Sequence, residues 1–381
     1  MKGSIRRRSK NSWEISIDLG RNLDGSRRRK YLNIKGKKSA ASRKLRELLT
    51  TADKGLPIEL SRETLGAYLL HWHESYAVPS TRPRTADRYM TDIKNHLTPL
   101  LGNIPLSKLT ADDIQAAEAK MLAKGLAARS VLHAHRVLAQ SLKHAVEKGH
   151  IWRNPCDVVK APKISRPMIE VPSPETVVNI LEKARTHLHY PAFHLLAFTG
   201  ARRGEICGLQ WGDIDLDQKR ISINRSAVRV KGRGVMMFPP KTESGRRNIA
   251  IDSQTVDVLR TLQGTQLVTK LDHDIPNSTT DHVLSDQLGN PLDPYVLTNS
   301  WRRLVSRLGI TGIRLHDLRH FHASLLLRMN THPKIVQERL GHSTISITLD
   351  TYSHSIPSLQ REAADSFADQ MKQVDMSANH K

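Results

Sequence analysis

Cysteines and long apolar runs are both scarce in this sequence. Cys156 and Cys207 are the two cysteines among 381 residues, so they cannot build a disulfide framework, and they match no paired zinc spacing. No apolar run approaches the ~18 residues needed to span a bilayer, and residues 1–10 lack the hydrophobic core of a secretory signal. We therefore expect a reduced, cytoplasmic protein that does not contact a membrane.

Acidic residues are few compared with basic ones. The chain has 59 Lys and Arg against 37 Asp and Glu, and this net charge of +22 predicts a polyanionic partner. Residues 1–60 alone contain 17 basic and 6 acidic side chains. A basic run can be a solvated tail, but here it is interleaved with strand-forming residues, which favours a folded nucleic-acid-binding module. The length allows two or three domains, each with its own core.

The N-terminal region, residues 1–57, has the pattern of a small sheet. Apolar and polar residues alternate from Trp13 to Leu19, as in a half-buried strand. Asp24-Gly25 marks a turn, and residues 28–34 and 4–8 supply two further strands before a helix over 40–49. Basic side chains along such strands can face a DNA groove. The candidate DNA contacts are Arg6, Arg7, Arg8, Arg27, Arg28, Arg29 and Lys30.

The rest of the chain is mainly helical. Residues 61–160 contain four helix patterns, and a capping box at Thr110 opens the third helix. A linker rich in proline and lysine follows over 160–172. Residues 171–361 begin with a helix capped by Ser173, and strand patterns occupy 220–224, 235–238 and 248–251. Helices return from about residue 255, and residues 362–381 are expected to form a C-terminal tail.

The segment 314–354 combines helical apolar spacing with several histidines and arginines. His316 and Arg319 are three residues apart, so a helix places them on one face, which can bind an anion. Gly341, just before His342, is suited to a left-handed helix cap. Tyr352 follows ten residues after His342. The chemistry of the protein is therefore expected to lie in this segment.

This pattern resembles the second conserved box of the tyrosine recombinases, the phage integrase family. Residues 199–205, Thr-Gly-Ala-Arg-Arg-Gly-Glu, followed by Leu209, Trp211 and Asp213, resemble the first box of that family. The resemblance extends from about residue 171 to residue 361. The N-terminal region resembles the arm-type DNA-binding domain that precedes many integrases, and residues 61–160 would correspond to their core-binding domain.

The resemblance implies a fold of three parts: a small three-stranded β-sheet plus a helix, a four-helix core-binding bundle, and a mainly α (α+β) catalytic domain. It implies a site-specific recombinase that cleaves and rejoins DNA through a 3′-phosphotyrosyl intermediate without ATP, metal or another cofactor. The implied partners are double-stranded DNA attachment sites, further copies in a homotetramer, and an accessory DNA-bending or excision factor. The implied setting is a prokaryotic cell, with the protein on the nucleoid when it acts.

The family pattern also assigns roles to single residues. Arg202 and Arg319 would bind the scissile phosphate, because a guanidinium gives two hydrogen bonds to phosphate and keeps its charge. His316 and His342 would add donors or transfer protons near neutral pH. Glu205 would steady the site. These residues are expected to lie close together in the folded chain.

Two further residues would carry the covalent and proton-transfer steps. Tyr352 would be the nucleophile, and its phenol, with an ordinary pKa of ~10, needs cationic surroundings to ionise. Lys241, in a Lys-Thr-x-Ser context, would be the general acid that protonates the leaving 5′-oxygen. Lys231 is the rival position for this lysine.

Other interpretations share some of these observations. His316, His320 and His322 have a spacing that can bind zinc, but no Glu follows His316 and the nearby arginines would repel a cation. A DNA-binding regulator could retain the fold without catalysis. A topoisomerase-like enzyme would share the chemistry, although the arm-like sheet favours an integrase. The C-terminal tail could pack on its own catalytic domain or on that of a neighbouring copy, and the sequence leaves both arrangements open.

Overall fold

The computed structural model describes residues 3–21, 27–53, 63–164, 171–240, 242–286, 289–352, 364–365 and 367–371. The chain divides into two compact units, Met1–Arg166 and Pro167–Lys381. No helix within the described ranges is both long and apolar enough to cross a bilayer.

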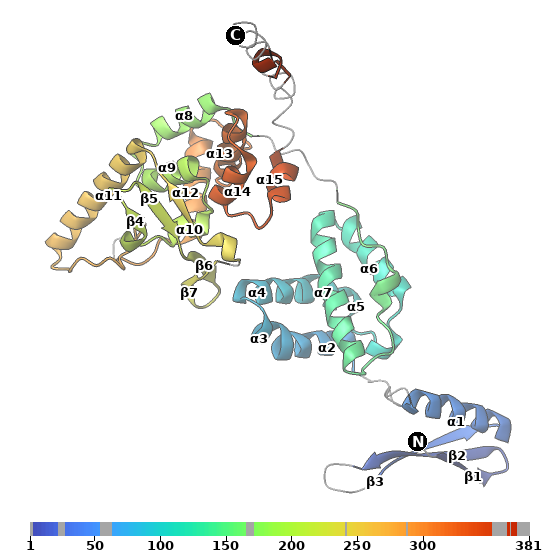
Figure 1. The fold of residues 1–381 in the computed structure, drawn as a ribbon. Coiled ribbons are helices and arrows are strands. Elements are labelled where there is room, and N and C mark those ends of the chain that lie inside the picture. Colours follow the sequence, from blue (N-terminus) through green and yellow to red (C-terminus); the bar gives the residue numbers. More distant parts are fainter. Residues whose placement is uncertain are drawn as a thin grey trace, which may run out of the picture. The chain divides into compact units, whose positions relative to one another are not determined.

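Three antiparallel strands and one helix form the N-terminal part of the first unit (Figure 1). They are β1 (Gly3–Ser9), β2 (Ser12–Arg21), β3 (Arg27–Lys35) and α1 (Lys38–Asp53), with β2 between β1 and β3. Ile15 and Ile17 of β2 are fully buried and cluster with Ala41 and Leu48 of α1, because alternation turns every second side chain toward the helix. The expected sheet with a helix is confirmed.

A helical bundle with its own core makes up the rest of the first unit. Its helices are α2 (Leu65–Trp72), α3 (Val78–Ser80), α4 (Pro83–Asp92), α5 (Thr98–Leu101), α6 (Ala111–Ala123) and α7 (Ala128–Glu147). Thr110 and Asp113 form the expected capping box at the start of α6. Val131, Leu138 and Leu142 lie on the buried face of α7.

Two π-helical turns interrupt this bundle. They are His73–Ala77, between α2 and α3, and Ile93–Leu97, between α4 and α5. Each is followed by a proline at the start of the next helix, Pro79 or Pro99. A proline has no N–H and its ring collides with the carbonyl four residues earlier, so the wider turn relieves a local conflict. The α-helical geometry of α4 therefore ends at Asp92.

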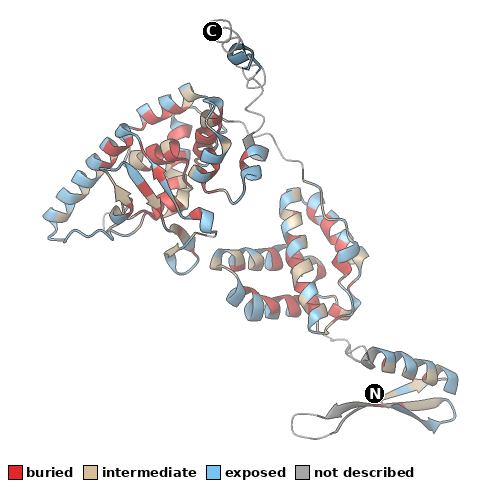
Figure 2. Cartoon of the chain, in the orientation of Figure 1, coloured by how far each residue is buried: buried red, intermediate tan, exposed pale blue. Residues whose placement is uncertain are grey.

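The second unit is mainly helical. Its helices are α8 (Pro174–Lys183), α9 (Tyr190–Thr199), α10 (Arg203–Cys207), α11 (Ser253–Asp272), α12 (Pro294–Arg307), α13 (Asp317–Arg328), α14 (Pro333–Leu340) and α15 (Ile345–Tyr352). Most of α9 is buried, and its Phe193 meets Trp301 of α12 edge to face at 5.1 Å between ring centres. Figure 2 shows the buried residues gathered around α9, α12 and α13.

Short strands lie beside these helices. β4 (Ile214–Asp215), β5 (Arg220–Ile223) and β8 (Arg247–Ala250) form one antiparallel sheet, and β6 (Ser226–Val230) pairs with β7 (Gly234–Phe238) in a separate hairpin. β4 and β6 were not expected from the sequence. Both are short, and each pairs with the next strand along the chain across a short turn, so they hold too few residues for an alternation pattern to reveal them.

Candidate active site

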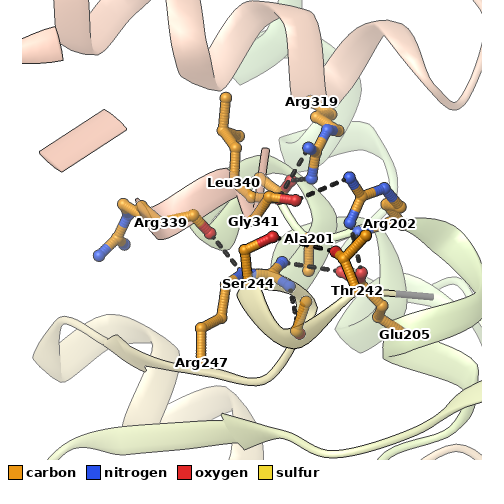
Figure 3. A network of polar contacts seen from close by, with 12 residues as sticks. Ala201, Arg202, Glu205, Thr242, Ser244, Arg247, Arg319, Arg339, Leu340 and Gly341 are labelled. Carbon is orange, nitrogen blue, oxygen red and sulfur yellow. Dashed lines mark hydrogen bonds and ion pairs between the residues drawn. The ribbon is translucent and has the colours of Figure 1, made fainter. Parts of the chain in front are cut away.

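Three arginines from different elements converge on the carboxyl end of α14 (Figure 3). The carbonyl of Arg339 accepts from Arg247 Nε at 2.7 Å, and that of Leu340 accepts from Arg319 Nη2 at 2.8 Å. The carbonyl of Gly341 accepts from Arg202 Nη2 at 3.0 Å. The last carbonyls of a helix lack partners within the helix and carry partial negative charge, so three guanidinium groups stabilise this end.

Gly341 makes the turn that ends α14, as the sequence predicts. Its φ of 66° and ψ of 46° are left-handed, which an L side chain rarely adopts. A Cβ at Gly341 would also lie 2.8 Å from Arg247 Nη1. The turn therefore needs glycine both for its backbone angles and for the space that Arg247 occupies.

Arg202 is at the N-cap of α10 and is bound to Glu205. The backbone N–H of Arg202 donates to Glu205 Oε2 at 2.8 Å, and its Nη1 donates to Oε1 at 2.7 Å. Burial would raise the pKa of Glu205, but hydrogen bonds and charges from Arg247 and Arg202 lower it below its usual range. Glu205 is thus a buried carboxylate held by two arginines. The Arg202 side chain is still 43% exposed, so it remains accessible to an anion.

Arg319 joins the two sequence boxes. On α13 it is buried at 3% exposure, and its Nη1 donates to the carbonyl of Gly200 at 2.7 Å while Nη2 binds Leu340. Gly200 ends α9 with a left-handed φ of 64°. Two segments more than a hundred residues apart in sequence are therefore fixed to one guanidinium.

His316 and His342 lie near these arginines. His316 is the N-cap of α13 with helical angles, so it shares a face with Arg319 as expected, and its ring meets His320 at 4.9 Å between centres. His342 Nδ1 is 2.8 Å from Thr348 Oγ1. Partial burial, then the charges of Arg319, Arg202 and Arg247, lower the pKa of His342 to about 4. It is therefore neutral at neutral pH, and its ring N–H can donate a hydrogen bond to a phosphate oxygen.

Sequence comparison places this arrangement among known proteins. The model for the phage integrase family matches residues 173–358, and the model for the phage integrase N-terminal SAM-like domain matches residues 64–122. The chain belongs to the phage integrase family. The α14 end, Arg202, Arg319 and His342 all lie within the first of these matches.

Two individual relatives agree with this assignment. A XerC-like tyrosine recombinase from Caldanaerobacter subterraneus is 28% identical over 94% of this chain and 96% of its own length. The ICEBs1 integrase of Bacillus subtilis is 28% identical over 73% of this chain and 75% of its own.

Two solved integrases share the fold. The Tn1549 transposon integrase, in complex with a circular intermediate DNA, matches 80% of this chain and 99% of that chain, with 21% identity and a TM-score of 0.67. A lambda integrase tetramer bound to a Holliday junction matches 91% and 95%, with 19% identity and a TM-score of 0.56. At these identities the likeness concerns the fold alone.

Two of the expected catalytic groups fall outside the described part. Lys241 lies outside the described residues, between Pro240 of the segment after β7 and Thr242. Tyr352 is the last residue of α15, but its side chain also lies outside what the structure describes. Lys231, the rival to Lys241, is exposed in the turn between β6 and β7. The roles of the two lysines and of Tyr352 stay predictions.

Arg247 and Arg339 were not identified as site residues from the sequence, and His322 was considered only as a possible zinc ligand. Arg247 and Arg339 hold the α14 end in place, and Arg339 Nε donates to His322 Nε2 at 3.0 Å. A signal for Arg247 existed, because strand alternation puts it on the same face as the buried Ile249. Arg339 gave no such signal, since its partners come from distant elements.

The sheet candidates differ in their surroundings. Arg6 is exposed, and Arg8 pairs with Glu14 at 2.5 Å. Arg7 lies with its guanidinium carbon 5.9 Å from the Trp13 ring centre and donates to the Ser9 carbonyl at 3.3 Å. The side chains of residues 27–30 lie outside the described part. Their contacts with DNA stay predictions.

The zinc interpretation can be set beside the geometry of the histidines. His322 turns its two ring nitrogens toward Ala197 and Arg339. Within the described ranges, no group of three or more His, Cys, Asp or Glu side chains is placed to hold a metal ion.

Proposed function

We propose that this protein is a site-specific DNA recombinase that integrates or excises a mobile element. It cleaves and rejoins duplex DNA through a covalent 3′-phosphotyrosyl intermediate. The observation that carries the proposal is the convergence of Arg202, Arg319 and His342 at the end of α14. Membership of the phage integrase family supports the same reaction.

In the cleavage step the Tyr352 oxygen attacks the scissile phosphorus. The phenol proton of Tyr352 is first lost to solvent, which cationic surroundings favour. A bond from phosphorus to the tyrosine oxygen then forms, the bond from phosphorus to the 5′-oxygen breaks, and Lys241 gives a proton to the departing oxygen. Extra negative charge develops on the non-bridging oxygens, and stabilising such charge is usually the largest catalytic contribution. Arg202 is 43% exposed, and the N–H groups that it does not give to Glu205 and the Gly341 carbonyl can donate to those oxygens.

The buried Arg319 and the neighbouring histidines add to this field. Arg319 contributes a permanent positive charge from a buried position, where the dielectric constant is lower and electrostatic interactions are stronger than in water. His342 is neutral at neutral pH, so it can donate a hydrogen bond to a phosphate oxygen without adding a charge to the site. His316, beside Arg319, would do the same.

Rejoining is the reverse of cleavage with a new partner. The 5′-hydroxyl of a second DNA strand gives its proton to Lys241 and attacks the phosphotyrosine. The bond from phosphorus to the 5′-oxygen forms, the bond from phosphorus to the tyrosine oxygen breaks, and the released phenolate of Tyr352 takes up a proton from solvent. Because the phosphotyrosine conserves the energy of the phosphodiester, neither ATP nor a metal is needed. Solved relatives include a tetramer bound to a Holliday junction. We propose that four copies of this chain assemble on two attachment sites in the same way, with an accessory DNA-bending or excision factor.

A nicked suicide substrate tests the proposal. The DNA junction at the border of the element next to the gene supplies the sequence, and a nick close to the cleavage point lets the short fragment diffuse away. The full chain should then accumulate a protein–DNA adduct that survives denaturation. Y352F should abolish the adduct, because the phenyl ring lacks the nucleophilic oxygen.

Y295F is the matched control, since Tyr295 on α12 is 60% exposed in the same unit. It should form the adduct at the wild-type rate. A chain that binds this DNA without any adduct would be a non-catalytic DNA-binding protein. Adducts that lead to relaxation of supercoils without exchange of partners would indicate a topoisomerase-like enzyme instead.

A further inference from the structure

Arg247 is a buried arginine that the proposed chemistry does not use directly. It opens β8, and its side chain is 6% exposed. Its three nitrogens point in three directions: Nε to the Arg339 carbonyl at 2.7 Å, Nη1 to the Gly245 carbonyl at 3.2 Å, and Nη2 to Glu205 Oε2 at 2.8 Å. Since these acceptors surround it, Arg247 cannot reach a phosphate in the way the exposed Arg202 can.

Each of these three bonds leads to a different part of the site (Figure 3). Glu205 binds Arg247 through Oε2, and its Oε1 accepts from Arg202 Nη1 at 2.7 Å. The Arg339 carbonyl belongs to the last turn of α14, immediately before the turn that carries His342. Gly245 belongs to the segment 242–245 that follows Lys241. One guanidinium thus connects α10, α14 and the segment after β7.

The packing around this guanidinium is tight. A Cβ at Gly341 would meet Arg247 Nη1 at 2.8 Å and the Ser244 carbonyl at 3.1 Å. Gly245, whose carbonyl accepts from Arg247, is itself packed against Pro240, because a Cβ there would lie 2.6 Å from Pro240 Cβ. A displacement of Arg247 would therefore press on the backbone of Gly341.

We propose that Arg247 is a positioning residue for DNA cleavage. It fixes the exposed Arg202 through Glu205 and fixes the turn of His342 through α14, while it makes no contact with DNA. This inference rests on the proposed recombinase function, and it assigns to Arg247 a role in the rate of the chemical step.

An arginine suits this place for geometric reasons. Its planar fork can serve three acceptors at fixed angles, whereas a lysine ammonium is a compact point charge on a flexible stem. R247K therefore keeps the positive charge beside Glu205 but cannot hold both carbonyls and the carboxylate at once. R247K therefore tests the hydrogen-bond geometry of the guanidinium while the positive charge stays in place.

The rate of adduct formation at saturating DNA is the decisive measurement. The full chain, R247K and two controls are mixed with the nicked duplex under single-turnover conditions, and DNA affinity and unfolding are measured on the same preparations. R247K should form the adduct about 30- to 100-fold more slowly, since a misplacement of ~1 Å can cost ~10²-fold. Its Kd for the duplex should stay within threefold of wild type.

The controls separate positioning from charge and from stability. R246K changes the exposed neighbouring arginine in the same conservative way. V256A removes buried apolar groups from α11, and none of the site hydrogen bonds involves that side chain. Both should stay within threefold of the wild-type rate. If R247K folds poorly, R247M is compared with L259A, which removes buried apolar groups from α11. R247M should then be slower than L259A at equal or higher stability, and equal rates at equal stability would overturn the inference.

Several outcomes would overturn the inference. An R247K rate within threefold of wild type would do so, and so would an equal loss of rate in V256A at the same stability. A loss of DNA affinity that accounts for the whole effect would assign Arg247 to DNA binding. If the wild-type chain itself forms no adduct, the proposed function fails, which is a separate result from a change among the variants.

Discussion

Protonation of His322 in mild acid should lower the free energy of unfolding of the second unit. Its Nδ1 is 2.9 Å from the Ala197 carbonyl, which can only accept, so the proton is on Nδ1. Its Nε2 then has the lone pair that accepts from Arg339 Nε at 3.0 Å. Protonation would remove this acceptor and set a second cation against Arg339. Burial first, and then the charges of Arg339 and Arg319, lower the pKa of His322 to about 4.

The size of the effect follows from the difference between the folded and unfolded pKa values. The unfolded state, with an ordinary histidine pKa of ~6.5, binds a proton that the folded state refuses until about pH 4. The free energy of unfolding therefore falls as the pH drops from about 6.5 toward 4. One pKa unit is worth ~1.4 kcal/mol, so His322 should remove about 2 kcal/mol between pH 7 and pH 5.

Hydrogen exchange followed by mass spectrometry can measure this loss in one unit of the chain. Peptides from α9 and α13 report opening of the second unit, whereas a melting curve would mix two units. After correction for intrinsic exchange rates, H322Q should lose about 2 kcal/mol less than wild type between pH 7 and pH 5. The subtraction cancels the other histidines, such as His342, whose pKa is also lowered. An equal acid loss in the two proteins would refute the assigned tautomer and the neutral state of His322.

Two further predictions concern the α14 turn and the metal alternative. G341A should lose about 1–2 kcal/mol of stability from its left-handed angles and should also slow adduct formation more than tenfold by displacing Arg247. G232A is its control, because Gly232 has a similar φ of 73° with nothing within 4 Å of a new Cβ, so equal rates in the two variants would contradict the clash. A strong chelator should leave the rate of adduct formation unchanged, and a loss that added zinc restores would revive a metal site near His316.

Some features could be predicted from the sequence because they depend on neighbours along the chain. The strand alternation of Ile15 and Ile17 and the capping box at Thr110 are local patterns, and both are present. Gly341 and its left-handed cap were likewise readable from a helix pattern that stops at glycine. The two boxes around Arg202 and Arg319 were recognisable because their residue types and spacing resemble those of the phage integrase family, whose model matches residues 173–358.

Other features depend on contacts that no local pattern encodes. The π-helical turns before Pro79 and Pro99 relieve a backbone conflict, and the apolar spacing of the sequence gives no sign of them. β6 becomes a strand by pairing with β7 across a short turn. Its residues, Ser226–Val230, are too few for alternation to single them out, so the pairing with the neighbouring strand decides.

The sequence by itself determined which chemical groups this protein has: a basic chain with two arginine-containing boxes, a glycine cap and a tyrosine beyond it. The tertiary structure decided how those groups are held. Three guanidinium groups meet three successive carbonyls at one helix end, and Glu205 is shared between Arg202 and Arg247. The physical reason is that buried charges must find partners at fixed distances, and those partners come from elements far apart in the chain.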